Sequence, residues 1–273
     1  MSAPLLVIDE PFRTLWHGRD PFAAVEALEG ELYRELAARR TLRFEVAGRG
    51  YFVKIHRGVG WAEILKNLLI LRLPVLGALN EWLAIKRLGE LGVDTMHSVA
   101  FGQSGSNPAS RHSFIVTEAL APTISLEDFC RDWPVQPPPL ALKRALIRRV
   151  AEMAERMHRG GVNHRDFYLC HFLLHQAPVP TAANLKLSII DLHRAQLRRE
   201  TPRRWRDKDL ASLYFSALEI GLTQHDLLRF LRIYFGRTLR EILRDETRLL
   251  AYLVRDAERL RLRYLRKFSN SDS

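Results

Sequence analysis

Two carboxylate-bearing motifs in the second half of the chain have the residue types that phosphoryl transfer requires. The first is the run His164-Arg165-Asp166, which follows a helical pattern that ends at Gly160-Gly161. The second is Asp191, which directly follows the apolar run LKLSII. A loop carboxylate can accept or orient the proton of an acceptor hydroxyl, and a carboxylate at the end of a strand can bind Mg²⁺.

Two residues in the first half of the chain have complementary chemistry. Lys54 lies in the apolar run YFVKI, and Glu81 opens the helical pattern NEWLAIKRLGELG. A lysine fixed on a strand can reach nucleotide phosphates, and a glutamate can hold its ammonium by an ion pair. Taken singly, a strand lysine is usually an exposed charge, and a glutamate at a helix start is usually favoured by the helix dipole alone. In combination, the order of Lys54, Glu81, His164-Arg165-Asp166 and Asp191 resembles that of protein-kinase-like phosphotransferases, which use ATP and Mg²⁺.

Three further residues surround the predicted catalytic loop. His171 occupies the position at which kinases usually place an asparagine that binds a second metal ion. An imidazole suits Mg²⁺ less well than an oxygen ligand does, so metal binding, a hydrogen bond to Asp166 and a structural role all remain open. Asp209, at the start of a helical pattern, and His164 are expected to support the loop structurally. The spacing of the nearby histidines and Cys170 does not match a standard zinc module.

The hydrophobic pattern indicates an α+β protein with two lobes. A β-hairpin is expected from Thr41 to His56, turning at 47–50, and a strand at 112–120 leads out of the first lobe. A long helical pattern with an apolar stripe covers residues 141–158, and helical patterns dominate after Lys208. We therefore expect a β-rich N-lobe at 1–118 that binds the nucleotide and a mostly helical C-lobe at 119–273.

A loop that covers the nucleotide phosphates is expected before the strand that carries Lys54. Gly48 and Gly50 lie too close to Lys54, because a whole strand must separate such a loop from the lysine. Counting back along the chain places the loop near EGELYREL, where Gly30 is the single glycine. Gly30 is therefore the candidate in the nucleotide-binding loop.

The composition restricts the class of protein and its partners. The 273 residues carry a formal net charge of +11, contain 47% hydrophobic residues and include two cysteines. These values exclude a mainly disordered chain and a disulfide-built fold, and favour an anionic partner. The first residues do not have the pattern of a secretory signal, so none is expected. The sequence also contains no apolar run long enough to span a membrane, so no membrane-spanning segment is expected. A nucleic-acid partner is not expected, because aromatic residues are not interleaved with the basic runs.

Longer motifs carry a more specific resemblance that covers nearly the whole chain. The segments EPFRTLWHGRDPF, GRGYFVKIHRGVGW, LPVLGALNEW, NHRDFYLCHFLL, IIDLHRAQ and RRWRDKDLASLYFSAL are similar to those of lipopolysaccharide core heptose(I) kinases, in the lipopolysaccharide kinase family. The resemblance implies ATP-dependent phosphorylation of a heptose hydroxyl in the inner core. It implies that Asp166 is the catalytic base, that Lys54 and Glu81 bind the nucleotide, and that Asp191 binds the metal. Arg165 is a second catalytic candidate, and Glu118 is a further candidate for nucleotide binding.

The resemblance also implies where the protein works and what it contacts. The acceptor is a membrane-anchored glycolipid, so the protein is expected in the cytoplasm, peripheral to the cytoplasmic face of the inner membrane. Candidate acceptor-binding residues lie in the Arg-rich stretch after Asp191, namely Arg194, Arg198, Arg203 and Arg204. A solvated basic face is the alternative explanation for that stretch. Lipid contact by residues 61–79 competes with ordinary packing, and the basic C-terminal stretch is compatible with an acidic protein partner.

Two other functions compete with this interpretation. One is a kinase for a small soluble acceptor, of the aminoglycoside-phosphotransferase type. The other is a non-catalytic basic scaffold, against which the retained Lys54, Asp166 and Asp191 argue.

Overall fold

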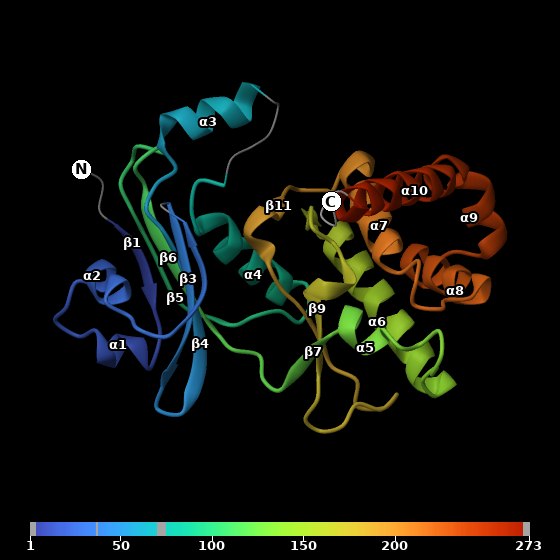
Figure 1. Cartoon of the computed structure of the whole chain (residues 1–273), viewed down its shortest axis with the longest axis horizontal. Helices are drawn as coiled ribbons and strands as arrows, with labels where there is room; N and C mark the ends of the chain where they lie inside the picture. Colours follow the sequence, from blue (N-terminus) through green and yellow to red (C-terminus); the bar gives the residue numbers. More distant parts are fainter. Residues whose placement is uncertain (1–3, 37, 70–74, 270–273) are drawn as a thin grey trace. The chain divides into compact units, whose positions relative to one another are not determined.

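The chain folds into two compact units, each built from segments that are separate in the sequence. The computed structural model describes residues 4–36, 38–69 and 75–269. The first unit contains the chain up to Lys86, together with Met96–Leu120 and Leu192–Arg194. The second unit contains Arg87–Thr95, Ala121–Asp191 and the chain from Ala195. An antiparallel sheet dominates the first and helices dominate the second, which confirms the expected α+β class (Figure 1).

The first unit is built on a six-stranded antiparallel sheet with the strand order β1-β5-β6-β4-β3-β2. Its elements in chain order are β1 (Leu5–Ile8), α1 (Phe12–Leu15), α2 (Pro21–Glu26), β2 (Glu31–Leu36), β3 (Arg39–Val46), β4 (Arg49–His56), α3 (Gly60–Leu69), α4 (Leu79–Glu90, which continues into the second unit), β5 (Ser98–Ser104) and β6 (His112–Glu118). Strands β3 and β4 form the expected hairpin, with Val46 opposite Arg49. Its turn at Ala47 and Gly48 has positive φ angles of 50° and 74°, a conformation common in tight hairpin turns.

The two faces of β4 have different partners. Tyr51, Val53 and Ile55 point into a core that α1 and α2 cover, and the ring of Tyr51 meets that of Phe12 edge to face at 5.0 Å. Because side chains alternate along a strand, Lys54 must point to the opposite face. That face carries the contact with α4, whose C-terminal end is followed by Gly92 at a φ of 65°. Hydrophobic alternation therefore sets the direction of the lysine.

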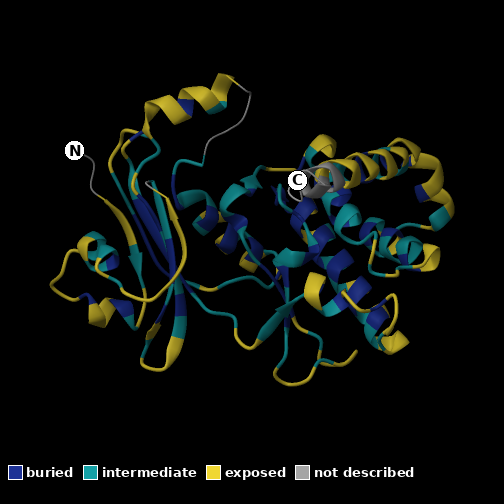
Figure 2. Cartoon of the chain, viewed as in Figure 1, coloured by how far each residue is buried: buried dark blue, intermediate teal, exposed yellow. Residues whose placement is uncertain are grey.

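The second unit is mostly helical. Its elements are β7 (Thr123–Ser125), α5 (Leu126–Cys130), α6 (Leu140–Arg159), β8 (Val162–Asn163), η1 (Leu169–His171), β9 (Phe172–His175), β10 (Leu187–Ile189), β11 (Gln196–Leu197), α7 (Arg203–Ser216), α8 (Gln224–Phe235), α9 (Leu239–Asp245) and α10 (Thr247–Ser269). The short turn η2 (Leu192–Arg194), which follows β10, belongs to the first unit. Helix α6 buries the expected stripe, including Leu146, Val150, Met153 and Met157. Figure 2 shows how burial is distributed over the helices and strands.

Short strands hold the segments that carry the predicted site residues in the second unit. Strand β8 pairs with β11 and leads directly into His164-Arg165-Asp166. Strand β9 pairs with β10, which ends just before Asp191. Among the helices that the structure describes, none has the length and apolar character needed to cross a membrane.

Candidate active site

A buried ion pair fixes Lys54 on the sheet face that contacts α4. Its Nζ lies 2.6 Å from Glu81 Oε1, and the side chains of Lys54 and Glu81 are 17% and 1% exposed. A buried carboxylate is costly unless a cation neutralises it, so the pair holds the ammonium in one place. Glu81 also lies in the first turn of α4, where the helix dipole favours negative charge. The structure confirms the expected pairing, and phosphate binding by Lys54 stays a prediction.

Asp209 of α7 holds the backbone of the predicted catalytic loop. Its Oδ2 accepts the N–H of His164 at 2.6 Å, and its Oδ1 accepts the N–H of Arg165 at 2.9 Å. Arg165 has a φ of +74°, a left-handed conformation that costs a residue other than glycine about 1–2 kcal/mol. The buried carboxylate therefore holds a strained turn in place immediately before Asp166, as expected of a structural support.

His164 adds a second set of contacts to this loop. Its Nε2 lies 2.9 Å from the carbonyl oxygen of Ile190, and its Nδ1 accepts the N–H of Asp166 at 3.3 Å. Burial lowers the pKa of His164, which favours a neutral ring. A neutral ring satisfies both contacts with its single proton on Nε2. His164 thereby ties the loop to the end of the segment that precedes Asp191.

A buried histidine and tyrosine extend the support of Asp209. His158 Nε2 lies 3.2 Å from Asp209 Oδ2, and His158 Nδ1 lies 2.8 Å from the hydroxyl of Tyr234. Burial raises the pKa of Tyr234, so it stays a phenol and can donate to Nδ1 while Nε2–H donates to the carboxylate. Sequence reasoning missed both residues. The available signal was a histidine within the apolar stripe of α6, where a buried polar group needs a partner.

Asp191 and His171 form the candidate metal site. His171 Nδ1 lies 2.6 Å from the carbonyl oxygen of Asp166, so it must donate there, and His171 Nε2 lies 3.8 Å from Asp191 Oδ2. In the neutral ring, Nε2 then presents a lone pair towards a carboxylate oxygen. Two electron-rich atoms that face each other in this way suit a cation between them. Among the described residues, no group of three or more histidine, cysteine or carboxylate side chains is arranged to hold a metal ion. Metal binding by Asp191 and His171 therefore stays a prediction, and His171 serves the loop through Nδ1.

Gly30 directly precedes β2, and most of EGELYREL forms this strand rather than the expected loop. Residues 31–36 form β2, and a side chain at Gly30 would collide with the backbone carbonyl of Arg43 on β3. The physical reason for the glycine is thus close strand approach. The connection from β2 to β3 follows Leu36, which pairs with Arg39, and part of it lies outside the described residues. Nucleotide binding by Gly30 stays a prediction.

Glu118 is the last residue of β6, in the first unit. Its N–H donates to the carbonyl of His97, and its carboxylate lies 3.4 Å from His97 Nδ1. Its side chain is 40% exposed, so it is accessible to a ligand. Its predicted nucleotide contact stays a prediction.

The four candidate arginines are divided between the two units. Arg194 belongs to the first unit, whereas the other three belong to the second. Arg198 donates to Asn163 Oδ1 at 2.7 Å, immediately before the catalytic loop. Arg204 lies against the ring of Trp205, and Arg203 is exposed at the start of α7.

Known proteins with similar sequences point to a single family. The sequence profile described as the lipopolysaccharide kinase (Kdo/WaaP) family matches residues 23–234. The chain belongs to this family. It is 66% identical over 255 residues to the lipopolysaccharide core heptose(I) kinase WaaP of Pseudomonas aeruginosa, covering 93% of this chain and 95% of that protein. It is 57% identical over 263 residues to a WaaP of Escherichia coli, covering 96% and 99%.

A solved structure has the same fold as this member of the lipopolysaccharide kinase family. That structure is described as WaaP in complex with acyl carrier protein. It superposes with a TM-score of 0.84 at 61% sequence identity, and the match covers 94% of this chain and 99% of that chain. The α+β fold is therefore that of the family.

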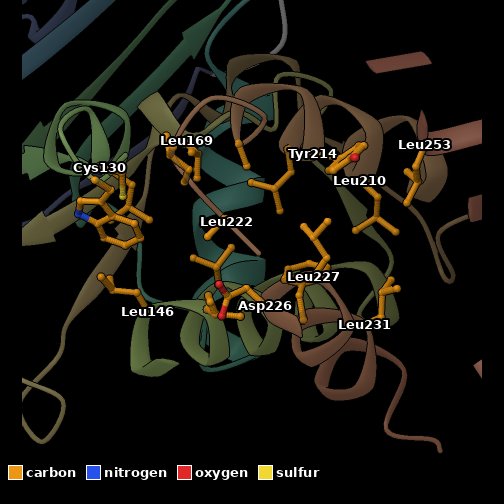
Figure 3. Close-up of a pocket in the computed structure, with 18 of the residues that line it drawn as sticks. Cys130, Leu146, Leu169, Leu210, Tyr214, Leu222, Asp226, Leu227, Leu231 and Leu253 are labelled. Atoms are coloured by element: carbon orange, nitrogen blue, oxygen red, sulfur yellow. The ribbon is translucent and has the colours of Figure 1, made fainter. Parts of the chain in front are cut away.

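The second unit of this kinase-family chain also contains an apolar cavity of about 220 Å³ (Figure 3). Its walls come from α5, α6, η1, α7, α8 and α10, and include Cys130, Leu146, Leu210, Leu227 and Leu253. The one carboxylate among the lining side chains is that of Asp226, which is already bound by Lys143 and by its own helix cap at Thr223. The cavity therefore suits an apolar ligand rather than a nucleotide.

Proposed function

We propose that this protein is an ATP-dependent kinase that transfers the γ-phosphate of ATP to a heptose hydroxyl of the lipopolysaccharide inner core. The observation that carries the proposal is the Asp209-anchored loop with Asp166, in a member of the lipopolysaccharide kinase family. The Lys54–Glu81 ion pair adds the cation that nucleotide phosphates require. Relatives of 57–66% identity are named for this activity.

Different residues of this chain have different roles in phosphoryl transfer. Lys54 binds and neutralises nucleotide phosphates, and Asp166 takes the proton of the acceptor hydroxyl. The hydroxyl oxygen then bonds to the γ-phosphorus, the bond from that phosphorus to the β,γ-bridging oxygen breaks, and ADP leaves. Arg165 places a positive charge beside Asp166. Mg²⁺, when bound, would neutralise charge on the phosphates, and Asp191 and His171 would hold it.

The direct test is a transfer assay with purified protein, Mg-ATP and inner-core lipopolysaccharide that lacks heptose phosphate. We expect radiolabelled phosphate to appear on the first heptose, as read by mass spectrometry of the core oligosaccharide. Transfer to a soluble aminoglycoside or sugar, with none to the glycolipid, would establish the small-acceptor alternative instead.

We also propose an acidic acyl carrier protein as a partner. The solved relative is described as a complex with such a protein. In this chain, the net charge of +11 suits an acidic partner, and the apolar cavity matches the chemistry of an acyl chain. Acidic side chains of the carrier protein would contact basic side chains on the surface of this chain, while the acyl chain occupied the cavity.

A cavity-filling variant tests this partnership. We expect acylated carrier protein to raise the Tm of the kinase, whereas unacylated carrier protein has little effect, because only the former fills apolar space. Leu227→Trp should abolish the acyl-dependent shift by filling the cavity. Leu243→Trp, at a position that is 48% exposed on α9, is the matched control. Equal shifts with both forms of the carrier protein would contradict the role of the cavity.

We propose that the protein works at the cytoplasmic face of the inner membrane, where its acceptor is anchored. Helix α3 supports this, because most of it is exposed (Figure 2). Its side chains of Trp61, Leu65, Leu68 and Leu69 are 47–84% exposed, while Ile64 is buried. Residues 70–74 of the apolar stretch lie outside the described residues. Leu65→Glu should reduce sedimentation with anionic vesicles by about 10-fold if α3 inserts its apolar face. Unchanged sedimentation would show that α3 does not contact lipid.

A further inference from the structure

Three cations of the second unit gather around the ring of Trp205, in the first turns of α7. Lys208 Nζ lies 4.7 Å from the ring centroid, and the Cζ atoms of Arg204 and Arg198 lie 5.1 and 5.8 Å from it. An indole ring attracts cations at such distances. Trp205 therefore brings together three like charges that would otherwise separate in water. We call Arg198, Arg204, Trp205 and Lys208 the Trp205 cluster.

The Trp205 cluster is tied to the catalytic loop through Arg198. The Nη1 of Arg198 donates to Asn163 Oδ1 at 2.7 Å, and its backbone N–H donates to the carbonyl of Gly161 at 2.8 Å. Asn163 is fully buried and directly precedes His164. One edge of the cluster is thus fixed next to the segment that carries Asp166.

The electrostatics of Lys208 show that the cluster has an excess of positive charge. Burial lowers the pKa of Lys208, and the nearby charges of Arg204, Arg165 and Arg259 lower it further, against an opposing effect of Asp256. Asp256 is itself paired with Arg259. The neighbours of Lys208 thus destabilise its charged form, and an anion placed beside it would stabilise that form.

We propose that the Trp205 cluster is the subsite for an anionic group of the acceptor glycolipid. This proposal rests on the proposed kinase function and narrows it. Guanidinium groups bind carboxylate and phosphate through paired hydrogen bonds, and an ammonium adds a point charge. The cluster binds a carboxylate or phosphate of the acidic inner core, and the contact with Asn163 positions that group relative to the catalytic loop. Trp205 acts as a positioning residue that keeps the cations together.

Single-charge variants test the subsite in the transfer assay. We expect Lys208→Gln and Arg204→Gln each to raise the acceptor KM by about 10-fold, the effect of losing one charge-assisted hydrogen bond. The KM for ATP should stay unchanged. Trp205→Leu should raise the acceptor KM as well, although all three cations remain. Arg199→Gln removes one charge from an exposed neighbour outside the cluster and should leave the acceptor KM unchanged.

The assay separates this proposal from the function on which it rests. If the wild-type protein phosphorylates no glycolipid, the proposed function fails first. If it does so and the acceptor KM is unchanged in the cluster variants, or rises equally in Arg199→Gln, the subsite alone is overturned. Loss of acyl carrier protein binding in Lys208→Gln, with an unchanged acceptor KM, would reassign the cluster to that protein. Acceptor stripped of its phosphates identifies the anion, since the KM effect of Lys208→Gln persists only if a carboxylate is bound.

Discussion

Replacing Asp166 with asparagine is expected to lower kcat for phosphate transfer by roughly 10²–10⁴-fold, the usual contribution of a general base. Asparagine matches aspartate in shape but cannot take a proton at neutral pH. The loop should survive the change, because residue 166 contacts His164 and His171 through its backbone N–H and carbonyl. The loss should therefore fall on kcat rather than on folding.

Single-turnover kinetics with saturating ATP measure this effect directly. The Kd for nucleotide and the circular dichroism spectrum of Asp166→Asn should match those of the wild type. Asp132→Asn, at an exposed position in the same unit, is the control for loss of one carboxylate. Asp191→Asn should behave differently, with weaker Mg²⁺-dependent nucleotide binding. A folded Asp166→Asn protein with the wild-type rate would remove Asp166 from the mechanism.

The local sequence pattern was sufficient to predict where a residue lies when strand or helix periodicity alone sets its position. Alternation along YFVKI separates Val53 and Ile55, which enter the core, from Lys54, which faces Glu81. The position of Glu81 in the first turn of α4 follows from the helical pattern that it opens. For Lys54 and Glu81, a short segment contains the whole signal. Asp209 was predicted as a support from the resemblance to kinase-like phosphotransferases, and it lies within α7 rather than at the start of a helix as expected.

Contacts between distant segments were not predictable in the same way. His158 and Tyr234 are 76 residues apart and meet through the packing of α6 against α8. The apolar cavity draws its walls from six elements that are spread between residues 126 and 254 of the sequence. Most of the expected loop at EGELYREL is a strand, and a glycine required for close strand approach has the same local signature as one in a turn. Sequence alone does not distinguish these uses.

Replacing Asp209 with asparagine is expected to damage both catalysis and stability. Oδ1 accepts one hydrogen bond and Oδ2 accepts two, from Arg165, His164 and His158. The amide must turn its NH₂ group towards at least one of these donors, which leaves a buried donor without an acceptor at a cost of about 1–3 kcal/mol. Arg165 would then be freer to leave its left-handed conformation, and Asp166 would lose its fixed position.

A Tyr234→Phe variant shows whether the Asp209 network positions the catalytic loop or only stabilises the fold. Tyr234→Phe keeps the ring but removes the donor to His158 Nδ1, so the imidazole can place its proton on Nδ1 and turn a lone pair towards Asp209. We expect a loss of about 1 kcal/mol in the free energy of unfolding and a several-fold lower kcat, both smaller than in Asp209→Asn. Tyr252→Phe, on α10, removes a hydroxyl away from this network and is the control.

The readout is kcat at a temperature at which every variant is fully folded, beside the free energy of unfolding from urea titration. If the network positions the loop, kcat should fall in the order wild type, Tyr234→Phe, Asp209→Asn, while the Kd for ATP stays constant, because Lys54 and Glu81 are untouched. If the network merely stabilises the unit, the free energies of unfolding will fall in that order and kcat will not. The strained φ of Arg165 favours the first outcome, since a strained turn relaxes as soon as its restraints weaken.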